Sequence, residues 1–318
     1  MALLDVNDLH VSFWTRQGEV QAVRGAMLNV EEGEILGLVG ESGSGKSTLV
    51  RSILRVLPEG ADITSGSVTF EGQELTTLSE REMRVVRGRE IAMIPQNPAT
   101  SLNPVLTVGN QLRRTLRTHR RLKGSGLQDK ALDMLDQMVI PDPKRVMNSF
   151  PHELSGGMQQ RSTGAVALSG DPKLLLADEP TTALDATVQA QYLALLKRLQ
   201  EERGVAIVFV THDLGIVATM CHRVAVMYAG EIVETAPTKQ LFEDPQHPYT
   251  EALINSIPPL NETVGKLRTI EGQPPRLNRP IIGCPFAPRC SYVMDRCREE
   301  VPPVTGDSEH LSRCWRHV

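Results

Sequence analysis

A segment rich in glycine and serine constrains this chain most, because it matches the phosphate-loop pattern GxxxxGK(S/T) between a predicted strand and a predicted helix. The apolar run over residues 35–39 predicts a buried strand before it. The small residues allow successive backbone N–H groups to face a phosphate chain. The segment consists of Gly40, Glu41, Ser42, Gly43, Ser44, Gly45, Lys46, Ser47 and Thr48. We therefore expect a nucleoside triphosphate site, in which Lys46 reaches the β- and γ-phosphates and Ser47 offers a hydroxyl to Mg²⁺.

A second candidate anion site lies in residues 154–161, whose sequence is Leu-Ser-Gly-Gly-Met-Gln-Gln-Arg. The hydroxyl of Ser155 and the backbone N–H groups of Gly156 and Gly157 could face a phosphate at the N-terminus of a predicted helix. Taken alone, the string also fits a glycine-containing helix N-cap. It resembles the signature motif of the ATP-binding-cassette (ABC) ATPases. That resemblance implies two cassettes packed head to tail, each signature motif completing the ATP pocket of the other.

Two carboxylates, Asp178 and Glu179, end the apolar run over residues 174–177. This stretch is similar to the family's Walker B motif, and the string over 180–185, which ends at Asp185, is similar to its D-loop. The resemblance implies that Asp178 holds the Mg²⁺ shell and that Glu179 polarises the attacking water.

Three single residues also have roles that the family resemblance implies. Gln96 resembles the Q-loop glutamine, which contacts Mg²⁺ and the water where the cassette meets its membrane partner. His212 resembles the switch histidine that contacts the γ-phosphate. Phe13 would stack on the adenine like the A-loop aromatic residue, although Phe13 or the adjacent Trp14 could instead pack on the core.

Composition narrows the class of protein. At 318 residues, the chain exceeds one ordinary core and predicts a large domain with an appendage. The formal net charge of −4 indicates no general attraction to nucleic acid. No apolar stretch approaches the roughly 18 residues that can cross a bilayer, and the N-terminal residues lack the basic and apolar regions of a signal peptide. We therefore expect a protein that reaches a membrane only through a partner.

The composition changes beyond Thr235, where proline becomes frequent and a loop-rich segment is predicted. Cys221 lies apart, beside an apolar run, and is predicted to be a small buried hydrophobic residue. The other cysteines cluster near the C-terminus: Cys284, Cys290, Cys297 and Cys314. In a reducing compartment such a cluster favours a metal site over disulfides.

A closer resemblance comes from the strings His-Pro-Tyr-Thr at 247–250, Gly-Cys-Pro-Phe-Ala-Pro-Arg-Cys at 283–290 and Cys-Trp at 314–315. Together with Pro-Gln-Asn-Pro at 95–98, they resemble the ATPases of dipeptide, oligopeptide and nickel importers. Some members carry a 4Fe–4S cluster on four cysteines of the C-terminal extension, so the resemblance implies one here. The cysteine spacing contains no CxxC, and zinc, two disulfides or no ligand role stay open as alternatives.

These observations predict an α/β fold: an ABC-type P-loop ATPase core with a helical subdomain, plus a small cysteine-containing C-terminal domain. We expect the nucleotide-binding domain to span 1–235, with its helical subdomain at about 97–171, and the importer-type C-terminal domain to span 236–318.

The expected function is that of the ATP-hydrolysing subunit of a membrane ABC importer, bound peripherally to the cytoplasmic face of the membrane. The expected partners are a second ABC ATPase subunit, identical or paralogous, two transmembrane permease subunits and an extracytoplasmic solute-binding protein, with no nucleic acid. A soluble ABC ATPase of DNA repair or translation and an ABC exporter ATPase are the alternatives. The residues do not choose between peptide, nickel and oligosaccharide as the solute.

Overall fold

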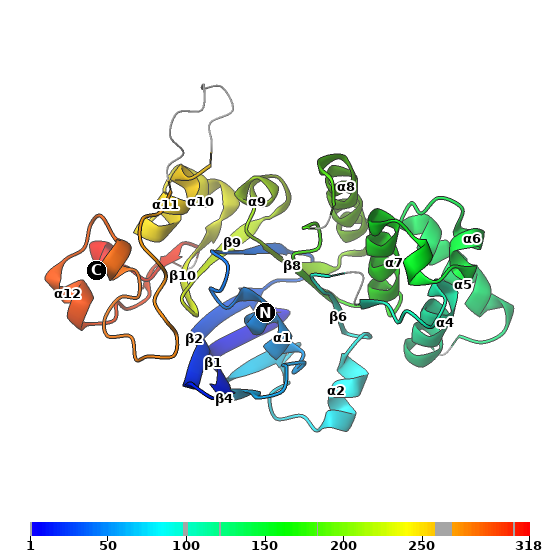
Figure 1. Ribbon diagram of the computed structural model, residues 1–318, viewed down its shortest axis with the longest axis horizontal. Helices are drawn as coiled ribbons and strands as arrows, with labels where there is room; N and C mark the ends of the chain where they lie inside the picture. The colour runs from blue at the N-terminus through cyan, green and yellow to red at the C-terminus, as the bar shows by residue number, and fades with distance from the viewer. Residues whose placement is uncertain (1, 98–100, 121, 183, 258–268, 308) are drawn as a thin grey trace. The chain divides into compact units, whose positions relative to one another are not determined.

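The computed structural model describes residues 2–97, 101–120, 122–182, 184–257, 269–307 and 309–318. Pro98 and Ala183, which belong to two of the matched strings, lie outside the described residues. The chain divides into two compact units. The first comprises Met1–Thr76 and Thr211–Val318, and the second comprises Thr77–Val210 (Figure 1).

The first unit contains a four-stranded antiparallel sheet. In spatial order, its strands are β2 (Gly18–Val30), β1 (Leu4–Thr15), β4 (Ala61–Phe70) and β5 (Gln73–Glu74). The alternation of Leu4 and Val6 with exposed positions places their side chains on the buried face, opposite Val30 and Leu28 of β2. Register shifts after Val6 show that β1 is bulged rather than regular.

A second group of strands in the same unit includes the strand before the phosphate loop. Its spatial order is β11 (Thr305–Gly306), β12 (Leu311–Ser312), β10 (Glu231–Pro237), β9 (Arg223–Tyr228) and β3 (Ile35–Val39). β3 runs parallel to β9, and every residue of β3 is buried. The predicted buried strand is therefore confirmed, and its continuous apolar run is typical of a parallel strand covered on both faces.

Helices cover these strands. α1 (Lys46–Ile53) packs on β1 and β2, whereas α9 (Leu214–Met220) packs on β3 and α10 (Thr238–Glu243) packs on β9 and β10. The rest of the C-terminal part has α11 (Pro248–Asn255) and α12 (Asp295–Glu299), with single 3₁₀ turns at Ala287–Arg289 and Trp315–His317. Over the described residues 269–286 and 300–304, the backbone forms no helix or strand, as the proline content predicts.

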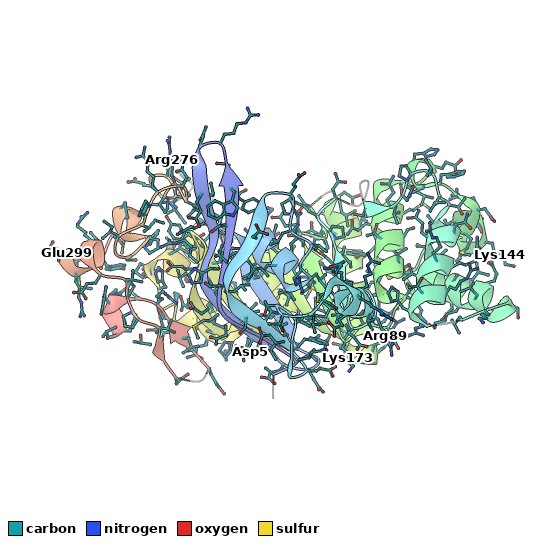
Figure 2. The ribbon with its side chains drawn as sticks, turned by 90° about the horizontal axis from the view of Figure 1, so that it is seen from below. Asp5, Arg89, Lys144, Lys173, Arg276 and Glu299 are labelled. Atoms are coloured by element: carbon teal, nitrogen blue, oxygen red, sulfur yellow. The ribbon has the colours of Figure 1, made fainter. Side chains whose placement is uncertain are left out.

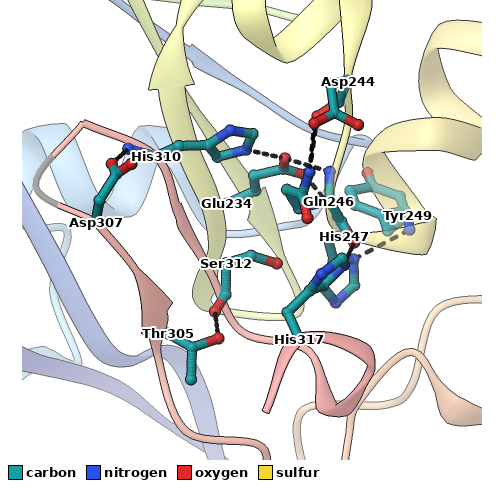
Figure 3. Close-up of polar contacts among 10 residues, drawn as sticks. All are labelled: Glu234, Asp244, Gln246, His247, Tyr249, Thr305, Asp307, His310, Ser312 and His317. Atoms are coloured by element: carbon teal, nitrogen blue, oxygen red, sulfur yellow. Dashed lines mark hydrogen bonds and ion pairs between the residues drawn. The ribbon is translucent and has the colours of Figure 1, made fainter.

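Within the first unit, the buried carboxylate of Glu234 in β10 holds residues from the C-terminal part of the chain. Its oxygens accept hydrogen bonds from the backbone N–H groups of Gln246 at 2.7 Å and His247 at 2.9 Å, and Oε1 lies 2.7 Å from Nε2 of His310 (Figure 3). Next to it, β12 pairs with β10 through Ser312 opposite Glu234. The last residues of the chain thus extend a sheet that also contains the strand leading to the phosphate loop.

The second unit contains the parallel strands β6 (Ile91–Ile94), β7 (Leu174–Asp178) and β8 (Ala206–Thr211), with β7 in the middle. β7 and β8 are buried along their whole length, again as continuous apolar runs predict. Its helices are α2 (Glu80–Val86), α4 (Val108–His119), α5 (Ser125–Gln137), α6 (Pro143–Asn148), α7 (Gly156–Leu168) and α8 (Ala186–Arg203).

Helices α4, α5 and α7 pack against one another, and α7 also packs on β6. Figure 2 shows the side chains of this unit, with Lys144 on α6 and Lys173 just before β7. Over the described part of the chain, no helix is both long and apolar enough to span a membrane.

Candidate functional site

The phosphate loop links the end of β3 to α1 through backbone conformations that only glycine adopts easily. Gly40 has a φ of 153° and Gly45 a φ of 106°. A Cβ atom on Gly40 would lie 2.1 Å from the carbonyl oxygen of Met227, and one on Gly45 would lie 2.3 Å from that of Ala22. The loop is therefore pressed against neighbouring backbone on both sides, which fixes its path.

Polar groups inside the loop are suited to an anion. The Lys46 side chain is 5% exposed, and its Nζ donates to the carbonyl oxygens of Gly40 at 2.8 Å and Glu41 at 3.0 Å. The Ser44 hydroxyl is buried and has no hydrogen-bond partner within the described residues. A buried hydroxyl without a partner is costly, and a phosphate oxygen would satisfy it. Lys46, at the first position of α1, provides a cation for the same ligand.

Sequence reasoning missed two residues that hold this loop. The backbone N–H of Glu41 donates to the Tyr249 hydroxyl at 2.8 Å, and the Glu41 carboxylate accepts two hydrogen bonds from Arg289. Both partners lie in the C-terminal strings over 247–250 and 283–290 that carried the importer resemblance. The strings drew attention to these residues, but nothing in their spacing connects them to Glu41.

The second unit brings Gln96 and Glu179 together. Gln96 follows β6, and its Nε2 donates to Oε2 of Glu179 at 2.9 Å. The same oxygen accepts a hydrogen bond of 3.1 Å from the Thr182 hydroxyl. Glu179 has a φ of 46°, and its backbone N–H donates a 3.0 Å hydrogen bond to the carbonyl oxygen of Val210. A non-glycine residue in this region is strained, and such strain is common at functional positions.

Asp178 precedes Glu179 as the last residue of β7 and is fully buried. Ser155 and Asp185 are both helix N-caps. At the start of α7, the Ser155 hydroxyl accepts a 3.4 Å hydrogen bond from the backbone N–H of Met158. At the start of α8, the Asp185 carboxylate accepts a 2.9 Å hydrogen bond from the backbone N–H of Val188. Gly156 has nothing within 4 Å of its would-be Cβ atom, so the start of α7 is open.

His212 and Phe13 belong to the first unit. His212 follows β8 and is exposed, just before Asp213, which caps α9. Phe13 is half-buried in β1, opposite Val20 of β2, while the neighbouring Trp14 is 59% exposed. A half-buried ring keeps part of its surface exposed, and the adenine role of Phe13 stays a prediction.

Comparisons with known proteins decide the family. The family model described as ABC transporter matches residues 23–182, and the one described as the C-terminal region of oligopeptide/dipeptide transporters matches residues 233–297. The probable peptide ABC transporter ATP-binding protein y4tR of Sinorhizobium fredii is 49% identical over 99% of this chain and 95% of its own length. The oligopeptide transport ATP-binding protein OppD of Bacillus subtilis is 48% identical over 98% of this chain and 88% of its own length. The chain belongs to the family of ABC transporter ATP-binding proteins.

A solved structure agrees with this assignment. The ATP-binding cassette MJ0796, whose dimer was determined with ADP and phosphate, is 30% identical to this ABC protein with a TM-score of 0.67, covering 74% of this chain and 98% of that one. The predicted ABC fold and the predicted ATP hydrolysis are therefore confirmed.

The predicted metal centre of the ABC protein is wrong. Cys284, Cys290, Cys297 and Cys314 line one pocket together with Phe286 and Trp315, but they are free thiols. Within the described residues, no group of three or more His, Cys, Asp and Glu side chains is placed to hold a metal ion. This finding overturns the 4Fe–4S cluster, the zinc alternative and the general expectation of metal binding in this extension.

The surroundings of three of these thiols disfavour the thiolate form. Burial raises the pKa of Cys284 to about 11 and also raises the pKa of Cys290 and of Cys314. The thiolate is the form that binds metals, and these surroundings favour the neutral thiol. The disulfide alternative is not met either, because all the cysteines are free. Cys221 is buried, as predicted, and burial raises its pKa to about 12.

Proposed function

We propose that this ABC protein is the ATP-hydrolysing subunit of an importer that takes up a peptide or a related solute. The observation that carries the proposal is the extent of the similarity. Relatives named for peptide, oligopeptide and dipeptide transport match almost the whole chain at 46–49% identity, including the C-terminal extension. A soluble ABC ATPase of DNA repair or translation and an exporter ATPase have no comparable support.

The reaction is ATP plus water to ADP plus phosphate. We assign the phosphates to the backbone of residues 40–48, with Lys46 as the cation on the β- and γ-phosphates, and the adenine to Phe13. Ser47, Asp178 and Gln96 offer the hydroxyl, carboxylate and amide oxygens that Mg²⁺ prefers, so the donor set fits the ion. Mg²⁺ would neutralise charge on the phosphates.

Glu179 is the proposed general base. Its Oε2 is fixed by Gln96 at 2.9 Å and by Thr182 at 3.1 Å, so the carboxylate is oriented before any water is positioned. Its direct contact with Gln96 supports the idea that the Q-loop and the base move together. His212 is assigned to the γ-phosphate.

We further propose that the signature residues act across a pair of cassettes. Ser155, Gly156, Gly157 and Asp185 would complete the ATP pocket of a second ABC subunit, identical or paralogous. The open N-terminus of α7 supports this role, because a helix N-terminus with small residues accepts an anion readily. The dimeric structure of the cassette MJ0796 is the precedent for such pairing.

We propose a nucleotide-binding domain at 1–235, with a helical subdomain at about 97–171, and a C-terminal domain at 236–318. Two separate family models, over residues 23–182 and 233–297, support a division of this kind. The proposed partners are two transmembrane permeases and, through them, an extracytoplasmic solute-binding protein. The subunit would therefore act at the cytoplasmic face of the membrane.

Reconstitution tests this function. The chain, its second cassette and the permeases are assembled in lipid vesicles, and peptide uptake and ATP hydrolysis are measured with solute-loaded binding protein. We expect ATP-dependent uptake of a di- or oligopeptide that stops in the Glu179→Gln variant. Uptake of nickel or an oligosaccharide but no peptide would contradict the solute class, and full ATPase activity without any membrane partner would contradict the transport role.

A further inference from the structure

The C-terminal extension contacts the phosphate loop through Arg289. Its guanidinium donates from Nη1 to Oε2 of Glu41 at 2.7 Å and from Nη2 to Oε1 at 2.9 Å. This is a two-pronged ion pair, which is stronger and more directional than a single contact. The Arg289 side chain is only 3% exposed and that of Glu41 is 27% exposed, so the pair is largely shielded from water.

Other contacts fix the guanidinium in this orientation. Nε donates to the carbonyl oxygen of Glu271 at 2.9 Å, and Nη2 donates to that of Ile270 at 3.2 Å. Nη1 also donates to the Tyr228 hydroxyl at 3.3 Å. The guanidinium carbon lies 5.8 Å from the centre of the Tyr228 ring and 6.0 Å from that of Phe286. Arg289 is therefore a rigid support for Glu41 rather than a flexible surface residue.

A second residue of the extension holds the same point of the loop. The Tyr249 hydroxyl accepts a 2.8 Å hydrogen bond from the backbone N–H of Glu41. The Tyr249 ring is fully buried. Its centre lies 4.5 Å from the centre of the Tyr228 ring and 5.4 Å from that of the Phe286 ring. Both the main chain and the side chain of Glu41 are thus fixed by residues far along the chain.

Glu41 is an unusual neighbour for a triphosphate because its carboxylate adds negative charge to an anion site. Like charges repel one another, and the repulsion grows as water is excluded. The Arg289 guanidinium neutralises that carboxylate and also fixes its position. Without Arg289, the loop would carry an uncompensated negative charge next to the position expected for the phosphates.

We propose that Arg289 is a positioning residue for ATP: through Glu41, it holds the phosphate loop in its binding conformation and cancels the loop's own negative charge. The C-terminal extension is thereby a required part of the nucleotide site. This inference rests on the proposed assignment of residues 40–48 to the phosphates of ATP.

The test compares variants of the full chain in the assembled transporter by ATP Kd, KM, kcat and thermal unfolding. Arg289→Gln should raise the Kd and KM for ATP about 10-fold with a smaller effect on kcat, because an unpaired carboxylate opposes the anion. Adding Glu41→Gln to Arg289→Gln should restore most of the affinity, because the repelling charge is gone. Arg289→Lys keeps the charge but loses the two-pronged geometry, so its KM should lie between those of the parent and Arg289→Gln.

His310→Ala is the matched control. His310 also fixes the extension, by its contact with Glu234, but it does not contact the phosphate loop. This variant should have a lower unfolding temperature, because it loses the His310–Glu234 contact that holds the extension. Its Kd for ATP should stay within about twofold of the parent value, because the contacts of Glu41 are retained.

Three outcomes would overturn the proposal. These are an unchanged ATP Kd in Arg289→Gln, equal losses of affinity in Arg289→Gln and His310→Ala, or no recovery in the Glu41→Gln double variant. If Arg289→Gln does not fold, an Arg289→Lys variant with parental KM would overturn it as well. Lys46→Ala distinguishes the role of Arg289 from the assignment of residues 40–48 to the phosphates. If Lys46→Ala loses ATP binding but Arg289→Gln binds ATP like the parent, only the role of Arg289 is refuted. If Lys46→Ala still binds ATP like the parent, the assignment of the phosphate site is refuted.

Discussion

The Gln96 side-chain amide donates a hydrogen bond of 2.9 Å to Oε2 of Glu179, although 83 positions separate the two residues in the chain. The residues follow β6 and β7, two parallel strands that are direct neighbours, so both emerge at the same edge of the sheet. Displacement of Gln96 would remove a side-chain hydrogen bond to Oε2 of the proposed base, which also accepts one from Thr182. The segment after β6 thus contacts the proposed base directly.

Glu179→Gln should retain ATP binding but reduce hydrolysis by about 10²-fold or more, because an amide has nearly the same shape but cannot act as a base. The measurement is ATPase activity of the assembled transporter, with ATP binding measured on the same preparation. Glu201→Gln, an exposed change on α8, is the control and should leave turnover intact. Near-normal turnover in Glu179→Gln would remove this residue from the reaction.

The glycines of the phosphate loop provide a graded test of its geometry. At Gly45 a Cβ atom would overlap the carbonyl oxygen of Ala22 at 2.3 Å, whereas at Gly43 it would meet nothing within 4 Å, although φ is 81° there. Gly43→Ala should therefore cost only about 1–2 kcal/mol of unfolding free energy, from its left-handed backbone. Gly45→Ala should cost more and weaken ATP binding, because backbone must move.

Urea unfolding and ATP binding of both variants check this prediction. Equal losses of stability would show that backbone strain alone matters at these positions. A milder effect at Gly45 than at Gly43 would contradict the close packing of the loop on Ala22.

Local patterns in the sequence were enough to predict the parts of the fold that depend on short-range chemistry. The loop over 40–48, the buried strand before it and the strand that ends at Asp178 all follow from glycines or apolar runs within a few residues. The contacts of Glu41 with Tyr249 and Arg289 span 208 and 248 positions. No periodicity encodes a pairing over that distance, because it depends on how the extension folds back.

The C-terminal cysteines show where the sequence pattern did not predict the chemistry. Their clustering near the C-terminus predicted a metal site, and this prediction is wrong, although Cys284, Cys290, Cys297 and Cys314 line one pocket. Their chemistry did not follow from the count, because the pKa of a thiol depends on the surrounding apolar side chains, which the spacing does not reveal.

His247 should make stability depend on pH. Burial, with the nearby His317 as a second cause, lowers the pKa of His247 from 6.5 to about 3. Between these values the unfolded chain binds a proton that the folded chain does not, so the free energy of unfolding falls as pH decreases from 6.5. The expected slope is up to about 1.4 kcal/mol per pH unit.

His247→Asn removes this titration but keeps a side-chain acceptor for the backbone N–H of Tyr249, which His247 Nδ1 caps at 3.0 Å. Urea unfolding at pH 7 and pH 5 should show a stability loss about 2 kcal/mol smaller in this variant than in the parent. Identical pH dependence in the two chains would show that His247 is protonated in the folded state at pH 5.

Ser155→Arg tests whether two copies of this chain complete each other's sites. The arginine would leave its own phosphate loop intact yet block the pocket of a partner, and Lys46→Ala would disable only its own loop. In a mixture, one pocket of each mixed pair has an intact Lys46 from one chain and an intact Ser155 from the other. ATPase activity of the mixture should therefore rise clearly above that of either variant alone.

Ser155→Ala controls for the lost helix cap, because it removes the hydroxyl that accepts from Met158 without adding bulk. It should cost about 1 kcal/mol of stability and block the partner's pocket far less than arginine does. If Ser155→Arg and Lys46→Ala chains stay inactive when mixed, two copies of this chain do not form composite sites. If Ser155→Arg alone hydrolyses ATP at the parental rate, the signature string acts only as the cap of α7.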